Sequence, residues 1–160
     1  MGTLYIPEEV TVQLLASEKT SWPTLRQLPA GLDTTNIAQG EFVGLLAYAG
    51  GNRTALKVTD AASAITLAKT ALMRIDDNSN VSLESNAISC QKGYFEVATA
   101  LYVKGEVYSA GQELTVRSGG VLGPVVAGTT HVNAVVEVPP ADSAAGTLME
   151  VTVFQPRPKA

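Results

Sequence analysis

Glycine-rich stretches can bind phosphate groups, and one such stretch, SAGQELTVRSGGVLGPVVAG, occupies residues 109–128. A P-loop has the pattern G-x-x-x-x-G-K-[ST] between a strand and a helix, and a dinucleotide fingerprint has G-x-G-x-x-G. The residue five places after Gly119 is Pro124, and Ser118 stands where the first glycine of the dinucleotide fingerprint belongs. The valines that follow favour a strand over a helix. The stretch therefore predicts a hairpin turn in which Gly119 or Gly120 adopts a positive φ, and no nucleotide site.

The run IDDNSNVSLE resembles a calcium-binding loop, because Asp76, Asn78 and Asn80 occupy its first, third and fifth positions. Such a loop needs glycine at position six and glutamate at position twelve, where this chain has Val81 and Ala87. Since Asp and Asn also dominate ordinary turns, we interpret the run as a turn and expect no bound metal.

The chain has one histidine, His131, and one cysteine, Cys90. No second His or Cys can complete a zinc site with either residue. A Ser–His–Asp triad can be assembled from distant parts of a chain, but no G-x-S-x-G elbow is present. The carboxylates are scattered, so that no acid–base pair can be nominated. We expect a histidine in an ordinary strand, a buried free thiol, no cofactor and no enzymatic activity.

The composition limits the classes of partner. The 160 residues include 46% hydrophobic and only 16% charged residues, and the net charge is −4. Nucleic-acid binding needs a basic surface, so we expect no nucleic-acid partner. No apolar stretch approaches the roughly 18 residues of a membrane span, and no signal peptide is visible at the N-terminus. These features predict a soluble protein that is synthesised in the cytoplasm and does not bind membranes.

The spacing of apolar residues and turn signals predicts a mainly β protein, a small β-sandwich or barrel-like domain with at most one or two short helices. We expect an extended N-terminal arm at residues 1–36, punctuated by prolines, and a first β-rich lobe at residues 37–92. A second β-rich lobe is expected at residues 93–155, followed by an exposed tail at residues 156–160.

Individual elements follow from the same signals. The apolar run Phe42–Tyr48 and the segment Ala55–Val58 predict a hairpin around a Gly-Gly-Asn turn. Asp60 can cap a helix at Ala61–Ala68 that precedes a strand at Thr70–Ile75, although this stretch also alternates as a strand would. The C-terminal half predicts strands at Tyr94–Ala98, Tyr102–Val107, Glu113–Arg117, Val121–Val126, His131–Val138 and Leu148–Phe154.

The last third of the chain resembles the capsid decoration, or cement, proteins of tailed phages and related virion proteins. The resemblance lies in Ala110-Gly111-Gln112 with Leu114 and Val116, and in Ser118-Gly119-Gly120 with Leu122 and Pro124. It continues through Ala127-Gly128-Thr129, Val132 to Val136, and Leu148 to Phe154. The pattern is a succession of strands and small-residue turns, not a catalytic signature.

The resemblance implies a structural protein that binds the outer surface of an icosahedral phage head and stabilises the lattice of the major capsid protein. It further implies a homo-oligomer, for which we expect a trimer rather than a dimer. The arm could add a strand to a neighbour's sheet, or it could pack against its own domain. The candidate partner-contact residues are Leu4, Tyr5, Ile6, Trp22 and Leu25.

A carbohydrate- or receptor-binding β module of a phage fibre or tail is the alternative, since the same β-rich fold could serve it. Such sites usually expose several aromatic side chains on one face, and aromatic residues make up only 6% of this chain.

Overall fold

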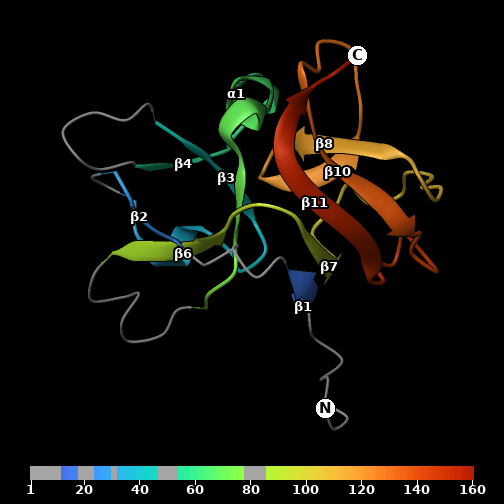
Figure 1. Ribbon diagram of the computed structural model, residues 1–160, viewed down its shortest axis with the longest axis horizontal. Helices are drawn as coiled ribbons and strands as arrows, with labels where there is room; N and C mark the ends of the chain where they lie inside the picture. Colours follow the sequence, from blue (N-terminus) through green and yellow to red (C-terminus); the bar gives the residue numbers. More distant parts are fainter. Residues whose placement is uncertain (1–11, 18–23, 30–31, 47–53, 78–85) are drawn as a thin grey trace, which may run out of the picture.

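The structure is a computed structural model that describes residues 12–17, 24–29, 32–46, 54–77 and 86–160 (Figure 1). These residues form two antiparallel sheets and one short helical segment, which confirms the predicted mainly β fold. Figure 1 shows the five-stranded sheet in the left half of the molecule and the six-stranded sheet in the right half, with α1 at the top between them.

The six-stranded sheet has the order β1-β7-β11-β10-β8-β9 and is built mainly from the C-terminal half of the chain. Its strands are β1 (Val12–Ser17), β7 (Phe95–Thr99), β8 (Glu113–Arg117), β9 (Val121–Pro124), β10 (His131–Val138) and β11 (Met149–Pro158). The bounds predicted for β8 and β10 are confirmed. Those of β7, β9 and β11 differ from the prediction by a few residues at one end or both.

The five-stranded sheet has the order β2-β6-β5-β3-β4. Its strands are β2 (Thr24–Gln27), β3 (Phe42–Leu45), β4 (Ala55–Lys57), β5 (Leu72–Arg74) and β6 (Ala87–Gln91). A parallel bridge between Gln27 and Thr54 brings the two outer strands together, so that this sheet curls into a barrel-like body. The predicted pairing of β3 with β4 is confirmed, and the Gly-Gly-Asn turn lies outside the described residues.

The ambiguous stretch after Asp60 is a helix followed by a strand, as we predicted. Helix α1 (Ala61–Leu67) continues into a 3-10 turn, η2 (Ala68–Thr70), and then into β5. A second 3-10 turn, η1 (Thr34–Asn36), precedes β3. Local capping decides between the two interpretations, because Asp60 satisfies the free amide of Ser63 at the start of α1.

A hydrophobic core joins the two sheets. Phe42 and Met73 of the five-stranded sheet belong to the same buried cluster as Phe95, Leu114 and Val136 of the six-stranded sheet. A smaller cluster is formed by buried residues of the five-stranded sheet and the segments next to it, namely Leu28, Ile37, Val43, Leu45, Ala55, Leu72, Ile88 and Cys90. The five-stranded sheet is therefore buried on both faces.

The strand predicted at Tyr102–Val107 is wrong. This segment forms only an isolated bridge from Tyr102 to Leu122, and its backbone leaves the sheet soon afterwards. Gly105 has φ +81° and turns the chain, and the ring of Tyr108 packs edge-to-face on that of Tyr102 at 5.4 Å. The aromatic and β-branched residues that predicted a strand therefore anchor a loop that covers the outer edge of β9.

Strand β11 extends to Pro158, although residues 156–160 were expected to be a tail. Beyond Val153 the described strand pairs with β10 and no longer with β7, and His131 lies opposite Pro158. Proline cannot donate to a central ladder, but it is tolerated where one side of a strand has no partner.

The described parts of the predicted arm include two strands, β1 and β2, and the 3-10 turn η1. Strand β1 pairs with β7, and β2 pairs with β6. Over these residues the chain follows the alternative in which the arm packs against its own domain. The division of the chain into lobes at residues 37–92 and 93–155 stays a prediction.

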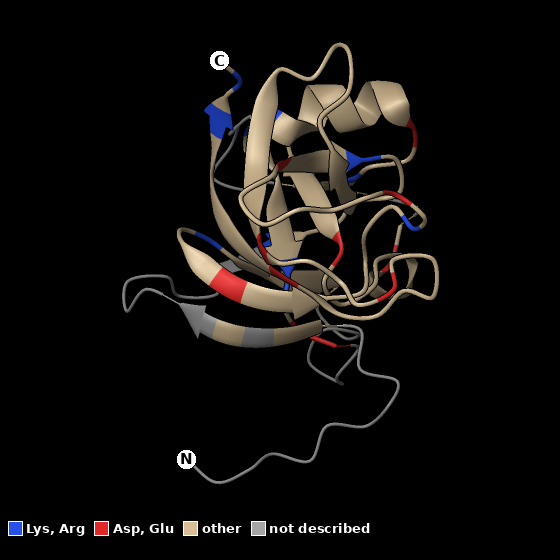
Figure 2. Ribbon diagram, turned by 90° about the vertical axis from the view of Figure 1, so that its right-hand side faces the viewer, with Lys and Arg blue, Asp and Glu red and all other residues tan. Residues whose placement is uncertain are grey.

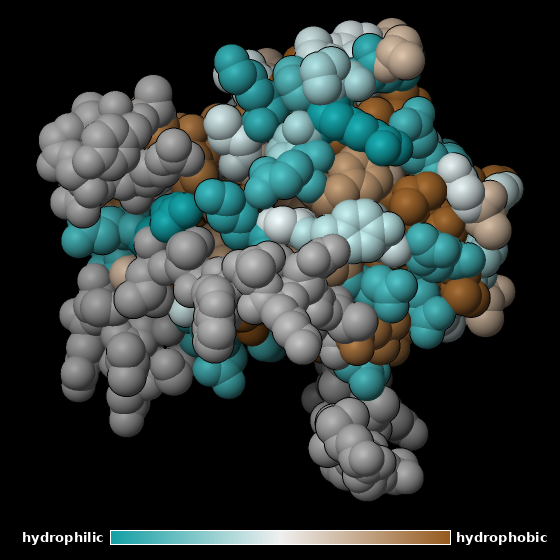
Figure 3. All heavy atoms as spheres, in the orientation of Figure 1, coloured by the Kyte–Doolittle hydropathy of each residue, from teal (hydrophilic) through white to brown (hydrophobic). Residues whose placement is uncertain are grey.

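Charged residues are scattered over the molecule, with basic residues next to the C-terminus (Figure 2). Apolar areas interrupt the hydrophilic surface on the face shown in Figure 3. The exposed large hydrophobic residues include Leu46, Tyr94, Val107 and Val138, of which Val107 is 83% exposed. In the part of the chain that the structure describes, no helix is long and apolar enough to cross a membrane.

Candidate functional site

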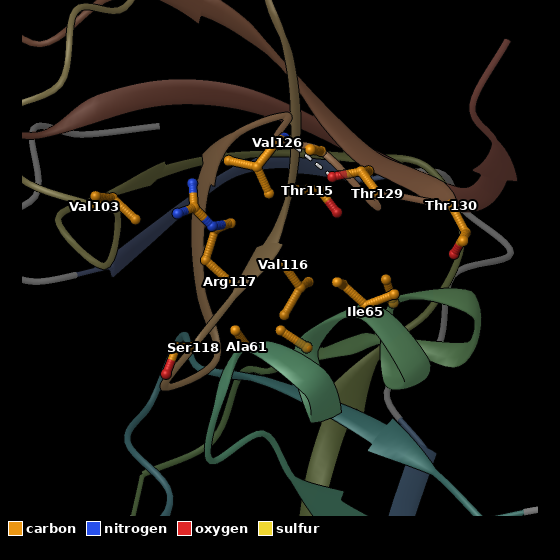
Figure 4. Close-up of a pocket in the computed structure, with 13 residues that line it drawn as sticks. Ala61, Ile65, Val103, Thr115, Val116, Arg117, Ser118, Val126, Thr129 and Thr130 are labelled. Atoms are coloured by element: carbon orange, nitrogen blue, oxygen red, sulfur yellow. Dashed lines mark hydrogen bonds between the residues drawn. The ribbon is translucent and has the colours of Figure 1, made fainter.

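A cleft of about 250 Å³ lies between α1, the β8–β9 hairpin and the loop that follows β9 (Figure 4). We call it the α1 cleft. It is lined by Ala61, Ala64, Ile65, Ala68, Val103, Thr115, Val116, Arg117, Ser118, Val126, Ala127, Thr129 and Thr130. The lining is largely apolar.

Helix α1 forms one wall of the α1 cleft, and a capping box fixes the residue at which the helix begins. The Asp60 carboxylate accepts a hydrogen bond from the Ser63 amide at 2.8 Å, and the Ser63 hydroxyl oxygen accepts one from the Asp60 amide at 3.0 Å. The Ser63 hydrogen bonds lower the pKa of Asp60, because they stabilise the carboxylate. The alanines at 61, 64 and 68 leave space between the helix and β8.

Asn133 of β10 fixes the other end of the helical segment to the sheet. Its side-chain Nδ2 donates to the carbonyl of Ala68 at 2.9 Å, and its Oδ1 accepts from the Val116 amide at 3.1 Å. Asn133 is buried, so these bonds satisfy groups that water cannot reach. Asn133 therefore links the end of the helical segment to β8.

Arg117 is the one ionisable side chain in the described lining of the α1 cleft. Its Nη1 donates to the carbonyl of Pro124 at 3.1 Å. The Thr115 hydroxyl donates a hydrogen bond to the carbonyl of His131 at 2.9 Å. The Thr129 hydroxyl oxygen accepts one from the Val126 amide at 3.1 Å. The arrangement suits an apolar group next to one positive charge and offers no nucleophile–base pair.

His131 and Cys90 lie in different sheets, in β10 and β6, so they do not form a catalytic pair. The His131 ring nitrogen Nδ1 lies 3.0 Å from the Thr130 hydroxyl. Cys90 is buried in the five-stranded sheet, and burial raises the pKa of its thiol to about 12. The expected buried free thiol is thus confirmed, and at neutral pH it remains protonated and unreactive.

The calcium-like run is only partly described, since residues 78–85 lie outside the described residues. Asp76 accepts hydrogen bonds from Arg74 Nε at 2.9 Å and from the Ser89 amide at 3.0 Å. Arg74 is fully buried, and its guanidinium also donates to the carbonyls of Thr34, Ile37 and Asp77. Asp76 therefore contributes to an internal network around a buried arginine. Among the described residues, no group of three or more His, Cys, Asp or Glu side chains could hold a metal ion.

The glycine-rich turn between β8 and β9 is hydrogen-bonded to the five-stranded sheet. Gly119 and Gly120 have φ +85° and +76° in the turn from β8 to β9, which confirms the predicted hairpin. The Gly120 carbonyl accepts a hydrogen bond from the Phe42 amide of β3 at 2.8 Å. The carbonyl group thereby links the six-stranded sheet to the five-stranded one.

Four of the predicted partner-contact residues, Leu4, Tyr5, Ile6 and Trp22, lie outside the described residues. Leu25 lies in β2, at an outer position of the five-stranded sheet, with its backbone opposite Ser89.

Sequence reasoning missed Arg117 and Asn133. Asn133 carries a signal, because it is a polar residue within the otherwise apolar run VNAVV of a predicted strand. Such a residue must find buried hydrogen-bond partners. Arg117 has no comparable signal, since its position in the cleft depends on a helix 50 residues away in the chain.

Compared with known proteins, the chain matches no family model and no curated protein, so its function is inferred from its own residues and geometry.

Proposed function

We propose that the chain is a decoration protein of a tailed-phage head, which binds the outer surface of the icosahedral shell and stabilises the lattice of the major capsid protein. In this role it is a structural virion protein without enzymatic activity, synthesised in the host cytoplasm and assembled as a homotrimer.

One observation carries the proposal. The stretch that resembles decoration proteins coincides with a contiguous antiparallel block, β11-β10-β8-β9, together with its glycine turns. The resemblance therefore covers a complete piece of the fold, which is what a shared architecture requires.

Binding to a capsid shell requires an interface that covers only a small part of this protein's surface. A stable interface buries about 800 Å² on each partner, which is roughly a tenth of the 8652 Å² that this chain exposes. Exposed apolar side chains such as Val107 and Val138 offer surface that an interface could bury.

Binding to empty shells tests the proposal. Purified protein is mixed with expanded capsids that lack it, and bound protein is measured after sedimentation. We expect saturable binding at a fixed number of copies per shell and an increase in the temperature at which the shell disassembles. Absence of the protein from purified virus particles, or a failure to sediment with shells, would overturn the proposal.

The mass of the protein in solution, measured by light scattering after gel filtration, tests the expected trimer. A specific hit on a glycan array without shell binding would instead favour the receptor-binding alternative.

A further inference from the structure

A second cleft, of about 210 Å³, lies where the five-stranded sheet meets η2 and the end of β11. We call it the basic cleft. It is lined by Arg26, Leu45, Lys69, Thr70, Ala71, Leu72, Lys92, Gln155 and Pro156. A cavity needs roughly 10–15 Å³ on this measure to hold one water molecule, so the basic cleft can accept a small ligand together with its hydration.

The charge of the cleft has one sign. Arg26, Lys69 and Lys92 line it, and no acidic side chain does so among the described residues. The ammonium groups of Lys69 and Lys92 have no hydrogen-bond or ion-pair partner within the described part of the chain. Both side chains are exposed at the rim, where a ligand from solution can reach them. The protein as a whole carries a net charge of −4, so the three cations form a local positive region on an acidic molecule.

Regular backbone elements position the three residues that carry these charges. Lys69 lies in η2, and the neighbouring Thr70 hydroxyl accepts from the Leu45 amide at 3.0 Å, which fixes η2 to β3. Lys92 follows directly after β6, and Arg26 lies in β2, which pairs with β6. Three separate elements therefore deliver positive charge to one place. The apolar side chains of Leu45 and Leu72 line the same cleft.

We propose that the basic cleft binds a small oxyanion, a phosphate or carboxylate group. Lys69 and Lys92 donate to its oxygens from the rim of the cleft, and Arg26 adds a third positive charge. Ammonium groups bind such oxygens through charge-assisted hydrogen bonds, which are stronger than neutral ones. This site is separate from the α1 cleft and does not depend on the proposed role on a phage head.

The test is a titration followed by ¹⁵N NMR at constant ionic strength, in a buffer without phosphate. Inorganic phosphate and citrate are the two probes, and sodium chloride is the control for unspecific screening. We expect saturable shifts of the amides of residues 69–72 and 92 with at least one probe, and none that saturate with chloride. The probe that binds more tightly identifies the ligand as phosphate or carboxylate.

Two double variants of equal charge make the test specific. Lys69→Gln/Lys92→Gln removes two positive charges at the rim of the basic cleft. Lys104→Gln/Lys159→Gln removes two positive charges from exposed lysines that do not line the cleft. The first variant should weaken binding about tenfold or more, because two charge-assisted contacts are lost. The second should bind as the unmodified protein does.

Equal weakening in both double variants would show that net charge alone attracts the anion and would overturn the proposal. Shifts that saturate only outside the cleft, or that chloride reproduces, would overturn it as well. Since all four lysines are exposed, both variants should keep the folded chemical-shift pattern, which the same spectra check.

Discussion

Gly119 and Gly120 are adjacent in one turn and both have positive φ, but their surroundings differ. A Cβ atom added at Gly119 meets no atom within 4 Å, whereas one at Gly120 would lie 2.6 Å from the Phe42 carbonyl oxygen. The first glycine is needed only for its backbone conformation. The second is needed also because β3 approaches its backbone closely.

Replacing each glycine by alanine separates these two requirements. Gly119→Ala should reduce the free energy of unfolding by about 1–2 kcal/mol, the cost of left-handed backbone for an L-residue. Gly120→Ala should cost a further ~1–3 kcal/mol, because the new methyl group forces β3 away from the turn. Urea unfolding followed by circular dichroism measures both. Equal losses in the two variants would contradict the assigned contact between Gly120 and β3.

Cys90 and Tyr108 make the stability of the protein sensitive to alkali. Burial raises the pKa of the Cys90 thiol from 9.0 to about 12, and burial likewise raises that of the Tyr108 phenol from 10.0 to about 12. Between about pH 9 and pH 12 the unfolded chain releases these protons while the folded chain keeps them. The free energy of unfolding should therefore fall as the pH rises through this range, and stay unaffected by these groups below it.

Cys90→Ala isolates the thiol contribution to this pH dependence. Its free energy of unfolding should decrease less steeply above pH 9 than that of the unmodified protein, although its value at pH 7 is lower. Unfolding in urea at a series of pH values measures both slopes. Identical slopes would show that the thiol ionises as easily in the folded protein as in the unfolded chain.

Among the helices and strands, the sequence predicted those whose ends are determined by residues close to them in the chain. The Asp60 cap gave the start of α1, and turn residues gave the bounds of β8 and β10. Strand β6 was not predicted, because its Ser, Cys and Gln residues lack strand character and its pairing with β2 and β5 joins distant segments. Tyr102 misled the prediction, since aromatic residues favour both strands and anchored loops.

The two clefts were beyond local reasoning. Ile65 of α1 and Val116 of β8 line the α1 cleft together because the helix packs against the six-stranded sheet. Lys69 and Lys92 line the basic cleft together because η2 leads into β5, which pairs with β6. Asn133 is the exception, since a lone polar residue in an apolar strand requires partners. From the sequence one could infer that such a partner exists, but not that it is the end of a helix.

Asn133 should control how firmly the helical segment is attached. Asn133→Ala leaves the buried Val116 amide without its partner and removes one of the two hydrogen bonds to the Ala68 carbonyl, which keeps that from the Ala71 amide. The loss should cost about 1–3 kcal/mol of unfolding free energy. Amide hydrogen exchange at residues 64–70 should accelerate more than exchange in β7. Thr130→Ala is the matched control, because Thr130 lines the same cleft and its hydroxyl has, among the described residues, a hydrogen bond to the neighbouring His131 ring and none to the helix. Protection of residues 64–70 that survives in Asn133→Ala would refute this role.

For the whole molecule, the question is whether the two sheets are one folding unit. Their strands come from largely separate parts of the chain, which is the pattern of two lobes. Yet β1 crosses from the N-terminal region to the six-stranded sheet, and one buried cluster contains residues of both sheets. Phe42 and Met73 of the five-stranded sheet are therefore buried together with residues of the six-stranded sheet.

Thermal unfolding should therefore be a single transition, with equal calorimetric and van 't Hoff enthalpies. Met73 is the most direct test, because it lies in β5, is buried and belongs to the cluster that joins the sheets. Met73→Ala should lower the free energy of unfolding by about 2–5 kcal/mol and shift the whole transition to lower temperature. Ile88→Val, which changes the smaller cluster within the five-stranded sheet, should give a smaller shift of about 0.5–1.5 kcal/mol, again without splitting the peak. Two transitions, of which Met73→Ala moves only one, would show that the lobes at residues 37–92 and 93–155 fold independently and that the shared core contributes little to their association.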